Sequence, residues 1–148
     1  MKYVNLFFMA ALSFISMYIL MYMMVDSYAN VYPNLNQFYM AGIMTVPMLI
    51  IELFLMRQMY TNTRLNTLII AGSLAVFVLL TLFLRKQTAI SDREFLRSMI
   101  PHHGAALLMC EQNSLQDPEI QELCKNILAT QQVEIDFMKA KLASMKKW

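Results

Sequence analysis

The sequence predicts an all-α protein, with three transmembrane helices followed by a helical hairpin outside the membrane. The chain is 58% hydrophobic and has only 3 Gly and 4 Pro, so it holds few of the turn residues that a β-sheet needs. Most apolar residues precede residue 85, and most charged residues follow it. This asymmetry predicts a transmembrane domain over residues 1–86 and a water-soluble hairpin over 91–146.

The composition also limits the classes of binding partner that we expect. A formal net charge of +2 without a run of basic residues indicates no nucleic-acid partner. Two cysteines are too few for a disulfide framework. The partner that the composition does imply is a lipid bilayer.

The first span is expected over residues 3–25, which carry no charged side chain. This stretch exceeds the about 20 residues that a helix needs to cross a bilayer. A cleaved signal peptide is the alternative, because Lys2 supplies a short basic start. The apolar stretch is too long for a signal peptide and no clear cleavage site follows it, so we favour a retained helix.

Two further spans are expected over residues 38–56 and 65–84. Pro47 lies inside the second span, where it removes a backbone donor and permits a kink. The linkers between the spans are short, so the three helices should pack as neighbours.

The distribution of basic residues predicts that the N-terminus lies inside and the hairpin outside. The linker over 26–37 has no Lys or Arg, and it shares a side of the membrane with the hairpin. Arg85 and Lys86, which follow the third span, favour the opposite orientation. The inner side carries Lys2, Arg57 and Arg64.

Methionines crowd the first two spans and their edges, whereas the third span has none. We favour flexible packing as the reason, because methionine fills irregular gaps between helices. A path of thioethers for a soft ion such as Cu(I) is the alternative. The residues are Met9, Met17, Met21, Met23, Met24, Met40, Met44, Met48, Met56 and Met59.

Glu52 is a carboxylate inside the second span, where a charge is costly and usually faces a partner or a cavity. Three explanations stay open. Glu52 is neutral and hydrogen-bonded to a Tyr or Asn on a neighbouring helix, it binds an ion or a proton, or it reaches the membrane edge near Arg57.

The hairpin helices have clear local start signals. Ser91 and Glu94 form a capping box, which predicts a helix from about Asp92 to about Asn113. After a turn, Asp117 is expected to cap a second helix that ends near residue 145. Pro118 then occupies the first helical position, where proline is favoured.

The first hairpin helix presents two neighbouring stripes at helical spacing. His102 and His103 are the two histidines of the chain, and they point about 100° apart. The central stripe is predicted to be Phe95, Met99, His102, Ala106, Met109 and Asn113. The flanking stripe is Leu96, Ile100, His103, Leu107 and Cys110.

The second hairpin helix carries two polar interruptions, Gln131 and Glu134, in its apolar stripe, and buried polar groups need partners. Folding the hairpin at residues 115–116 brings Met99 and His102 to the level of these two side chains. Because the polar residues of the two helices lie at one level, we predict a binding site between the helices. The whole stripe is Ile120, Cys124, Ile127, Gln131, Glu134, Ile135, Met138, Leu142 and Met145.

The residue types indicate a soft metal. Methionine and histidine favour Cu(I) or Ag(I), with Glu134 as a ligand or as the residue that orients an imidazole. Zinc is disfavoured because methionine is a poor zinc ligand. The chain has no Glu-x-x-His pair, so a di-iron oxidase is not expected. We expect a binding protein and not an enzyme. The structural alternative is a His–Glu hydrogen bond that satisfies two core polar groups.

Two features of the hairpin have more than one interpretation. Pro101 frees the Arg97 carbonyl, and it either opens space for ligands or curves the helix. We favour Cys110 and Cys124 as small core residues, with a disulfide or a thiolate site as alternatives.

A hairpin of this size cannot bury both flanks of its broad apolar stripe alone. A second copy is therefore expected to complete a four-helix bundle, as a homodimer or a higher even oligomer.

The hairpin resembles the family catalogued as domain of unknown function 305. The first helix matches through Phe95-x-x-x-Met99-Ile100-Pro101-His102-His103-x-x-Ala106-x-x-Met109. The second helix matches through Asp117, Pro118, Glu119, Ile120, Ile127, Gln131, Glu134, Ile135, Met138 and Leu142. The resemblance covers about residues 91–145 and not the three spans.

That resemblance implies a ferritin-like four-helix fold, in which many members carry two hairpins per chain. Some members are periplasmic proteins that bind Cu(I) or Ag(I) and assist copper tolerance. We therefore expect a copper-binding protein for tolerance or trafficking, anchored in a bacterial inner membrane with its hairpin in the periplasm. The alternative is a non-catalytic structural or oligomerisation module. By similarity, the candidate ligands are Met99, His102, His103, Met109, Glu134 and Met138. The extra Met/His clusters of the copper-rich members are absent.

Overall fold

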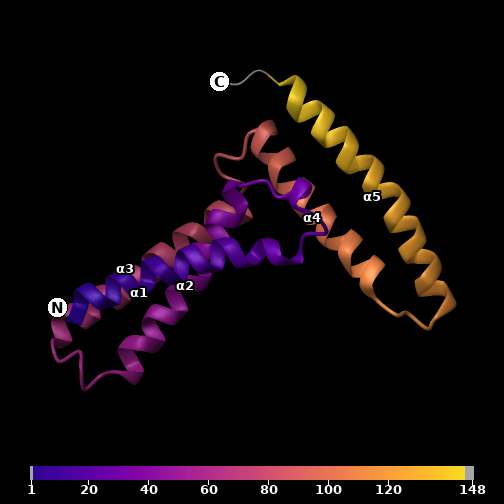
Figure 1. Ribbon diagram of the computed structural model, residues 1–148. Helices are drawn as coiled ribbons and strands as arrows, with labels where there is room; N and C mark the ends of the chain where they lie inside the picture. Colours follow the sequence, from indigo (N-terminus) through magenta and orange to yellow (C-terminus); the bar gives the residue numbers. More distant parts are fainter. Residues whose placement is uncertain (1, 146–148) are drawn as a thin grey trace. The chain divides into compact units, whose positions relative to one another are not determined.

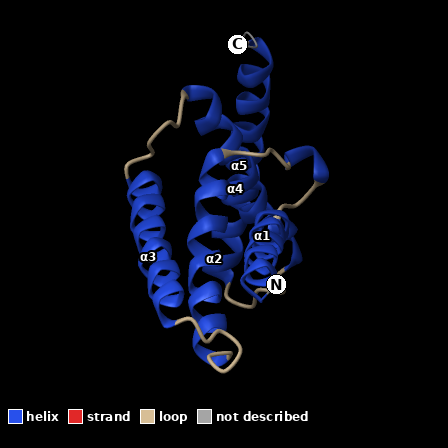
Figure 2. Cartoon of the chain, turned by 90° about the vertical axis from the view of Figure 1, so that its left-hand side faces the viewer, coloured by secondary structure: helices blue, strands red, loops and turns tan. Residues whose placement is uncertain are grey.

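The computed structural model describes residues 2–145, and every regular element in that range is a helix (Figures 1 and 2). The predicted all-α class is confirmed. In chain order the elements are α1 (Lys2–Leu20), η1 (Met21–Met24), η2 (Tyr28–Asn30), α2 (Leu35–Leu55), α3 (Thr63–Arg85), α4 (Asp92–Gln112) and α5 (Pro118–Ser144).

The chain divides into two compact units. The first contains residues 1–21 and 36–89, and therefore α1, most of α2, and α3. The second contains residues 22–35 together with the chain from Ile90 onward. The linker between the first two spans thus belongs to the same unit as the hairpin.

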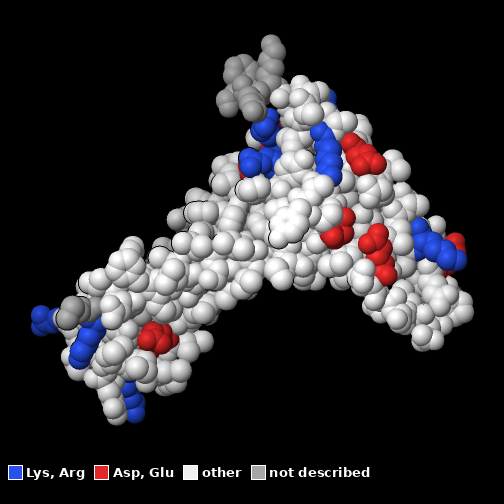
Figure 3. Space-filling view, viewed as in Figure 1, with Lys and Arg blue, Asp and Glu red and all other residues white. Residues whose placement is uncertain are grey.

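Three helices of the described chain are long and apolar enough to cross a membrane, as the sequence predicts. They cover Lys2–Met24, Leu35–Leu55 and Thr63–Arg85. Few of their side chains are buried, and α3 has no buried residue. Figure 3 shows Lys and Arg atoms at the end of the first unit that holds the N-terminus, with Asp or Glu atoms beside them and an uncharged surface farther along the unit. An exposed apolar surface of this kind suits contact with lipid chains.

The first unit has a small core at the end where α1 begins. Leu6 of α1 and Leu53 of α2 pack with Tyr60 of the following loop. Gly42 of α2 allows Leu80 of α3 to approach the α2 backbone, because a Cβ atom there would collide with the leucine. Asn62 caps α3 by accepting a hydrogen bond from the Leu65 amide at 3.1 Å.

Glu52 has a tyrosine neighbour, although not on the neighbouring helix that one of its three explanations names. The Tyr60 hydroxyl lies close enough to the Glu52 carboxylate for the two groups to interact. Burial of Tyr60 raises the pKa of its hydroxyl, and the nearby Glu52 carboxylate raises it further. The partner lies in the loop after α2 and not on a neighbouring helix.

In the second unit, α4 and α5 form an antiparallel hairpin around an apolar core. The buried residues of that core are Leu96, Ile100, Leu107, Ile135, Met138 and Leu142. Segment 22–35 also packs on α4, since Asn34 hydrogen-bonds to the Arg97 carbonyl and η2 contacts the helix.

The predicted central stripe of α4 is wrong, because the face that the helix buries is shifted by about one residue position. The helix buries Leu96, Ile100 and His103 instead, whereas Phe95 is 50% exposed and Met109 is 53% exposed. The buried flank holds three large aliphatic side chains, which remove more apolar area from water than a stripe interrupted by a histidine, an alanine and an asparagine. The two histidines do point in different directions, as expected.

The start signals of the hairpin helices are confirmed in part. Asp117 caps α5 by accepting from the amides of Glu119 at 2.8 Å and Ile120 at 3.1 Å. Ser91 accepts from the Glu94 amide at 3.4 Å, as the capping box predicts.

The reciprocal half of that capping box is wrong. The Glu94 carboxylate does not return to Ser91. It accepts from the Leu35 amide at 3.0 Å and pairs with Arg97 at 3.0 Å. The Glu94 carboxylate therefore stabilises the start of α2 as well as the start of its own helix.

Candidate functional site

The geometry of the site centres on His103, which is 9% exposed on the buried face of α4. Its Nε2 atom lies 2.6 Å from Oε2 of Glu134 on α5. Its Nδ1 atom lies 3.0 Å from the backbone carbonyl oxygen of Met99, one turn earlier in α4. Both ring nitrogens therefore face oxygen atoms.

These contacts determine what the imidazole can do. A carbonyl oxygen only accepts hydrogen bonds, so Nδ1 must carry a hydrogen and donate it to Met99. Nε2 is then left to share a proton with Glu134 or to offer its lone pair to a ligand. A hydrogen bond from Nδ1 to a backbone carbonyl is a common way to orient a metal-binding histidine.

Two methionines lie one helical turn from the His103–Glu134 contact. Because the helices are antiparallel and His103 meets Glu134, the residue four before His103 and the residue four after Glu134 lie in register. These residues are Met99 and Met138. Met138 is buried in the hairpin core, and Met99 packs against that core from α4.

The structure separates the six predicted ligands into two groups. Met99, His103, Glu134 and Met138 gather at the α4–α5 interface. His102 and Met109 are exposed on the neighbouring stripe of α4. The two imidazole rings are 6.0 Å apart between centroids and inclined by 62°.

The site is accessible from solution on its Glu134 side. The Glu134 side chain is 60% exposed, whereas the His103 side chain is 11% exposed. Glu134 therefore stands at the rim of the interface and His103 inside it. A ligand can reach Nε2 if the carboxylate moves.

Within residues 2–145 no group of three or more His, Cys, Asp or Glu side chains could hold a metal ion. Zinc sites and hard-cation sites are built from side chains of these types. Met99 and Met138, which pack in the same core, carry sulfur, a soft ligand.

Gln131 was noted in the sequence as a polar interruption but not as a site residue. Its Oε1 atom is buried and has no hydrogen-bond partner. It lies one turn before Glu134 on α5, so an unpaired oxygen adjoins the His103 level. The spacing of Gln131 and Glu134 in the sequence is the signal that could have identified it.

Segment 22–35 positions α4 in a way that sequence reasoning missed. Asn34 is buried and donates to the carbonyls of Tyr32 at 2.9 Å and Arg97 at 3.4 Å. The Arg97 carbonyl is the one that Pro101 deprives of its helical donor. A side chain from a distant segment therefore supplies the missing donor, and the proline itself is buried.

The same segment approaches α4 at Gly104, directly after His103. A Cβ atom on Gly104 would collide with the Asp26 carboxylate and press against Val25. Asn30 holds that carboxylate through bonds from Nδ2 to its two oxygens, at 2.7 and 2.9 Å. Glycine is thus needed here for close packing.

Cys110 and Cys124 form a disulfide, so our preference for unpaired core residues is wrong. The bond joins the end of α4 to the start of α5, with Cα atoms 5.3 Å apart. Both cysteines lie on inward flanks near the turn, which is what makes them neighbours. Such bonds persist mainly in oxidising compartments.

Comparisons with known proteins agree with the hairpin pattern. A family model described as Domain of unknown function (DUF305) matches residues 55–146. The match starts before α3, so the expected limit at residue 91 is wrong. A curated relative, the uncharacterized protein L153 of Acanthamoeba polyphaga mimivirus, is 30% identical over 141 residues, which cover 93% of this chain and 91% of the relative. No solved structure matches the chain.

Proposed function

Because the chain belongs to the DUF305 family, we propose that it is a membrane-anchored protein that binds Cu(I) or Ag(I) at its hairpin, for copper tolerance or trafficking. The observation that carries this proposal is the buried His103. Its Nδ1 is held by the Met99 carbonyl, and its Nε2 is directed at an exposed carboxylate. That arrangement leaves one ring nitrogen for a ligand.

The ion is cargo, and the protein is not an enzyme in this proposal. An ion bound at Nε2 would replace the contact of that nitrogen with the Glu134 carboxylate. The thioethers of Met99 and Met138 are the soft donors nearest in register. A soft monovalent ion accepts this mixture of imidazole and thioether better than zinc or a hard cation does.

A second copy of the chain completes the proposed bundle. The exposed stripe of α4 and the outer face of α5 leave large apolar side chains in solution, and a second hairpin would cover them. His102 and Met109 lie on that stripe, so each copy offers two further donors to its neighbour. The exposed residues are Phe95, Met109, Ile120, Leu123 and Phe137. We propose a homodimer or a higher even oligomer.

We further propose that the membrane is a bacterial inner membrane and that the hairpin lies in the periplasm. Two observations support this. Three helices of the described chain are apolar enough to span a bilayer. The Cys110–Cys124 bond suits an oxidising compartment outside the cytoplasm.

A structural module without metal is the second candidate, and one observation favours it. The 2.6 Å contact with Glu134 already satisfies His103 Nε2, so the pair needs no ion to be stable. In that case the His–Glu contact only sets the register of α4 against α5. The protein would then assemble fully in the absence of metal.

Binding of Cu(I) to the full chain in detergent separates the two candidates. We expect wild type to compete with a chromogenic Cu(I) chelator, and the double variant His102→Ala/His103→Ala to fail. Met99→Leu/Met138→Leu should weaken binding by about tenfold or more, because two ligands are lost. Met145→Leu, at another partly buried position of the same core, is the matched control.

Thermal unfolding with and without Ag(I) gives an independent measure. Ag(I) should raise the Tm of wild type and leave that of the double histidine variant unchanged. If both proteins bind equally, or if Ag(I) shifts neither Tm, the metal proposal fails. The structural module then remains.

A further inference from the structure

Most basic side chains of the described hairpin lie at the end where α4 begins and α5 ends. The first two turns of α4 carry two arginines, and the last two turns of α5 carry two lysines. Because the helices are antiparallel and Glu134 meets His103, these two pairs lie at nearly the same level. We call the four residues the basic end: Arg93, Arg97, Lys139 and Lys141.

The other end of the hairpin, at the Cys110–Cys124 bond, is acidic. Lys125 is the one Lys or Arg between residues 98 and 138, and it pairs with Glu122 at 3.5 Å. At about 1.5 Å per residue, Lys125 lies about 24 Å from Lys141 along α5, which is about three times the distance over which salt screens charges. The two ends therefore interact independently with charged partners. The acidic residues of this end are Glu111, Asp117, Glu119 and Glu122.

Three of the four cations at the basic end have no partner in the part of the chain that the structure describes. Arg97 pairs with Glu94 at 3.0 Å, whereas Arg93 and the two lysines form no ion pair or hydrogen bond there. The Nη1 atom of Arg93 is moreover buried without a hydrogen-bond partner. A guanidinium has only donors, so Arg93 lacks an acceptor. The first turn of α4 holds two acids, Asp92 and Glu94, so positive charge remains in excess at this end.

A contact within the second unit places the basic end beside the membrane boundary. Leu35 is the first residue of the second candidate span, and its amide donates to the Glu94 carboxylate at 3.0 Å. Glu94 directly follows Arg93 in the first turn of α4. The basic end therefore lies at the level where a span leaves the apolar part of a bilayer, which is also the level of the lipid phosphate groups.

We propose that the basic end binds the phosphate groups of anionic phospholipids in the bilayer that the three spans cross. The proposal rests on the membrane anchoring stated above and not on the metal site. A Lys or Arg near an anionic lipid surface strengthens binding by about fivefold. Arg93 is only partly buried, so its long side chain can turn outward and direct its planar set of donors at phosphate oxygens.

The acidic end of a second copy is another anionic surface, and the membrane excludes it as the occupant. Copies that cross one bilayer in the same orientation hold their basic ends at one height. The acidic end of a neighbour is then about 20 Å farther along the hairpin, beyond the reach of a lysine side chain. The basic ends of neighbouring copies would instead repel one another, and lipid phosphate groups between them would remove that repulsion.

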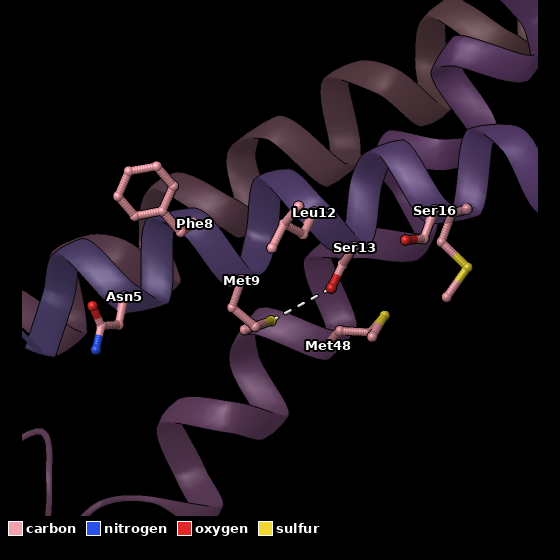
Figure 4. A pocket seen from close by; sticks show the side chains of 8 residues that line it. Asn5, Phe8, Met9, Leu12, Ser13, Ser16 and Met48 are labelled. Carbon is pink, nitrogen blue, oxygen red and sulfur yellow. Dashed lines mark hydrogen bonds between the residues drawn. The ribbon is translucent and has the colours of Figure 1, made fainter.

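Lipid contacts elsewhere on the chain need not depend on the charge of the headgroup. An open depression along α1 is lined by apolar and uncharged polar side chains, among them Phe8, Leu12 and Met48 (Figure 4). It can contact acyl chains, but it offers no positive charge to a phosphate group. A dependence on headgroup charge therefore cannot come from this depression.

The test measures how fast an amine-reactive reagent modifies each lysine, because a lysine bound to phosphate groups is shielded from the reagent. The full chain is placed in nanodiscs of phosphatidylcholine alone, or of phosphatidylcholine with an equal part of anionic phosphatidylglycerol. Mass spectrometry reads Lys125, Lys139 and Lys141 separately. We expect phosphatidylglycerol to slow the modification of Lys139 and Lys141 by about fivefold and to leave Lys125 unchanged. High salt should abolish the difference, because the interaction is electrostatic.

Two matched variants test the contribution of the unpaired arginine. Arg93→Gln removes one charge from the basic end, and Lys125→Gln removes one charge from the acidic end. The slowing at Lys139 and Lys141 should become weaker in Arg93→Gln and stay as in wild type in Lys125→Gln.

The proposal fails if phosphatidylglycerol leaves Lys139 and Lys141 unchanged, if it slows Lys125 equally, or if Arg93→Gln behaves as wild type. It also fails if glycerol phosphate in solution slows the two lysines as much in phosphatidylcholine nanodiscs, because the ligand is then a soluble anion. A chain that does not enter nanodiscs would overturn the membrane anchoring as well. None of these measurements involves a metal ion, so their failure leaves the proposed metal site unaffected.

Discussion

Nε2 of His103 lies 2.6 Å from Oε2 of Glu134, and this contact joins α4 to α5 between a buried side chain and an exposed one. The asymmetry has an energetic consequence. Without the carboxylate, the imidazole inside the interface loses its partner at Nε2. Without the imidazole, the exposed carboxylate is solvated by water. The contact is therefore more important for His103 than for Glu134.

Replacing Glu134 tests this asymmetry directly. Glu134→Ala should destabilise the hairpin by about 1 kcal/mol, a small value because the carboxylate is largely exposed. Glu134→Gln retains an oxygen acceptor and should cost less. Hydrogen exchange of α4 and α5 amides measures the change for this unit alone. Equal protection in wild type and Glu134→Ala would contradict a role for the contact in stability.

The Cys110–Cys124 bond should stabilise the same unit against unfolding. It closes a loop of 14 residues in sequence separation, for which chain entropy gives about 3 kcal/mol. Reduction should therefore lower amide protection in α4 and α5. In the Cys110→Ser/Cys124→Ser variant, a reductant should have no further effect. Unreduced wild type that contains two free thiols by mass spectrometry would show that the bond does not form.

Gly104 should be intolerant of any side chain, unlike Gly72 of α3. Gly104→Ala sets a methyl group against Asp26 and Val25 and should cost about 1–3 kcal/mol, because segment 22–35 must shift. Gly72 has nothing within 4 Å of the position of a Cβ atom, so Gly72→Ala should be neutral or stabilise its helix by up to about 1 kcal/mol. Amide protection in α4 and in α3 measures the two effects. Equal tolerance at both glycines would show that segment 22–35 does not pack on α4.

Asn34 and Pro101 should be energetically coupled. Asn34→Ala removes the donor to the Arg97 carbonyl, which has no helical donor as long as residue 101 is proline. Pro101→Ala restores a backbone N–H at that place. The cost of Asn34→Ala should therefore be lower by about 0.5–1 kcal/mol in the Pro101→Ala background. Additive costs in this double-mutant cycle would exclude the coupling.

The exposed apolar face of the hairpin should mediate the proposed self-association. Phe95→Ser/Leu123→Ser removes two large side chains from that face, which are 50% and 56% exposed in one copy. The variant should shift the protein toward the monomer in sedimentation or light scattering in detergent. Gln132→Ser, at an exposed polar position of α5, is the control and should change nothing. Unaltered assembly of the double serine variant would place the interface elsewhere.

Local chemistry made most helix boundaries predictable. An uninterrupted apolar length identifies a span because the bilayer sets that length. Asp117 with Pro118 identifies the start of α5 because both act on the adjacent backbone amides. A contact between a histidine and the Gln131–Glu134 level was predictable because polar side chains interrupt an apolar stripe on each helix, but the predicted histidine was His102 and the observed one is His103.

The rotation of α4 was not predictable in the same way. Two adjacent stripes of that helix are both apolar enough to be buried, and the choice depends on what packs against them. The hairpin core buries Ile100 and Leu107, and segment 22–35 covers Gly104. Met109 thereby became an exposed residue, although its spacing suits an inward ligand.

The sequence by itself determined the number, the length and the local starts of the helices, as well as the residue types that make a soft-metal site chemically reasonable. Tertiary structure decided which of two adjacent histidines is buried, that the two cysteines pair, and that Glu94 serves Leu35 rather than Ser91. The physical reason is the separation along the chain of the groups that interact. Helix starts and spans depend on groups a few residues apart or on the bilayer, whereas burial and pairing depend on segments that are distant in the chain and become neighbours only in the folded protein.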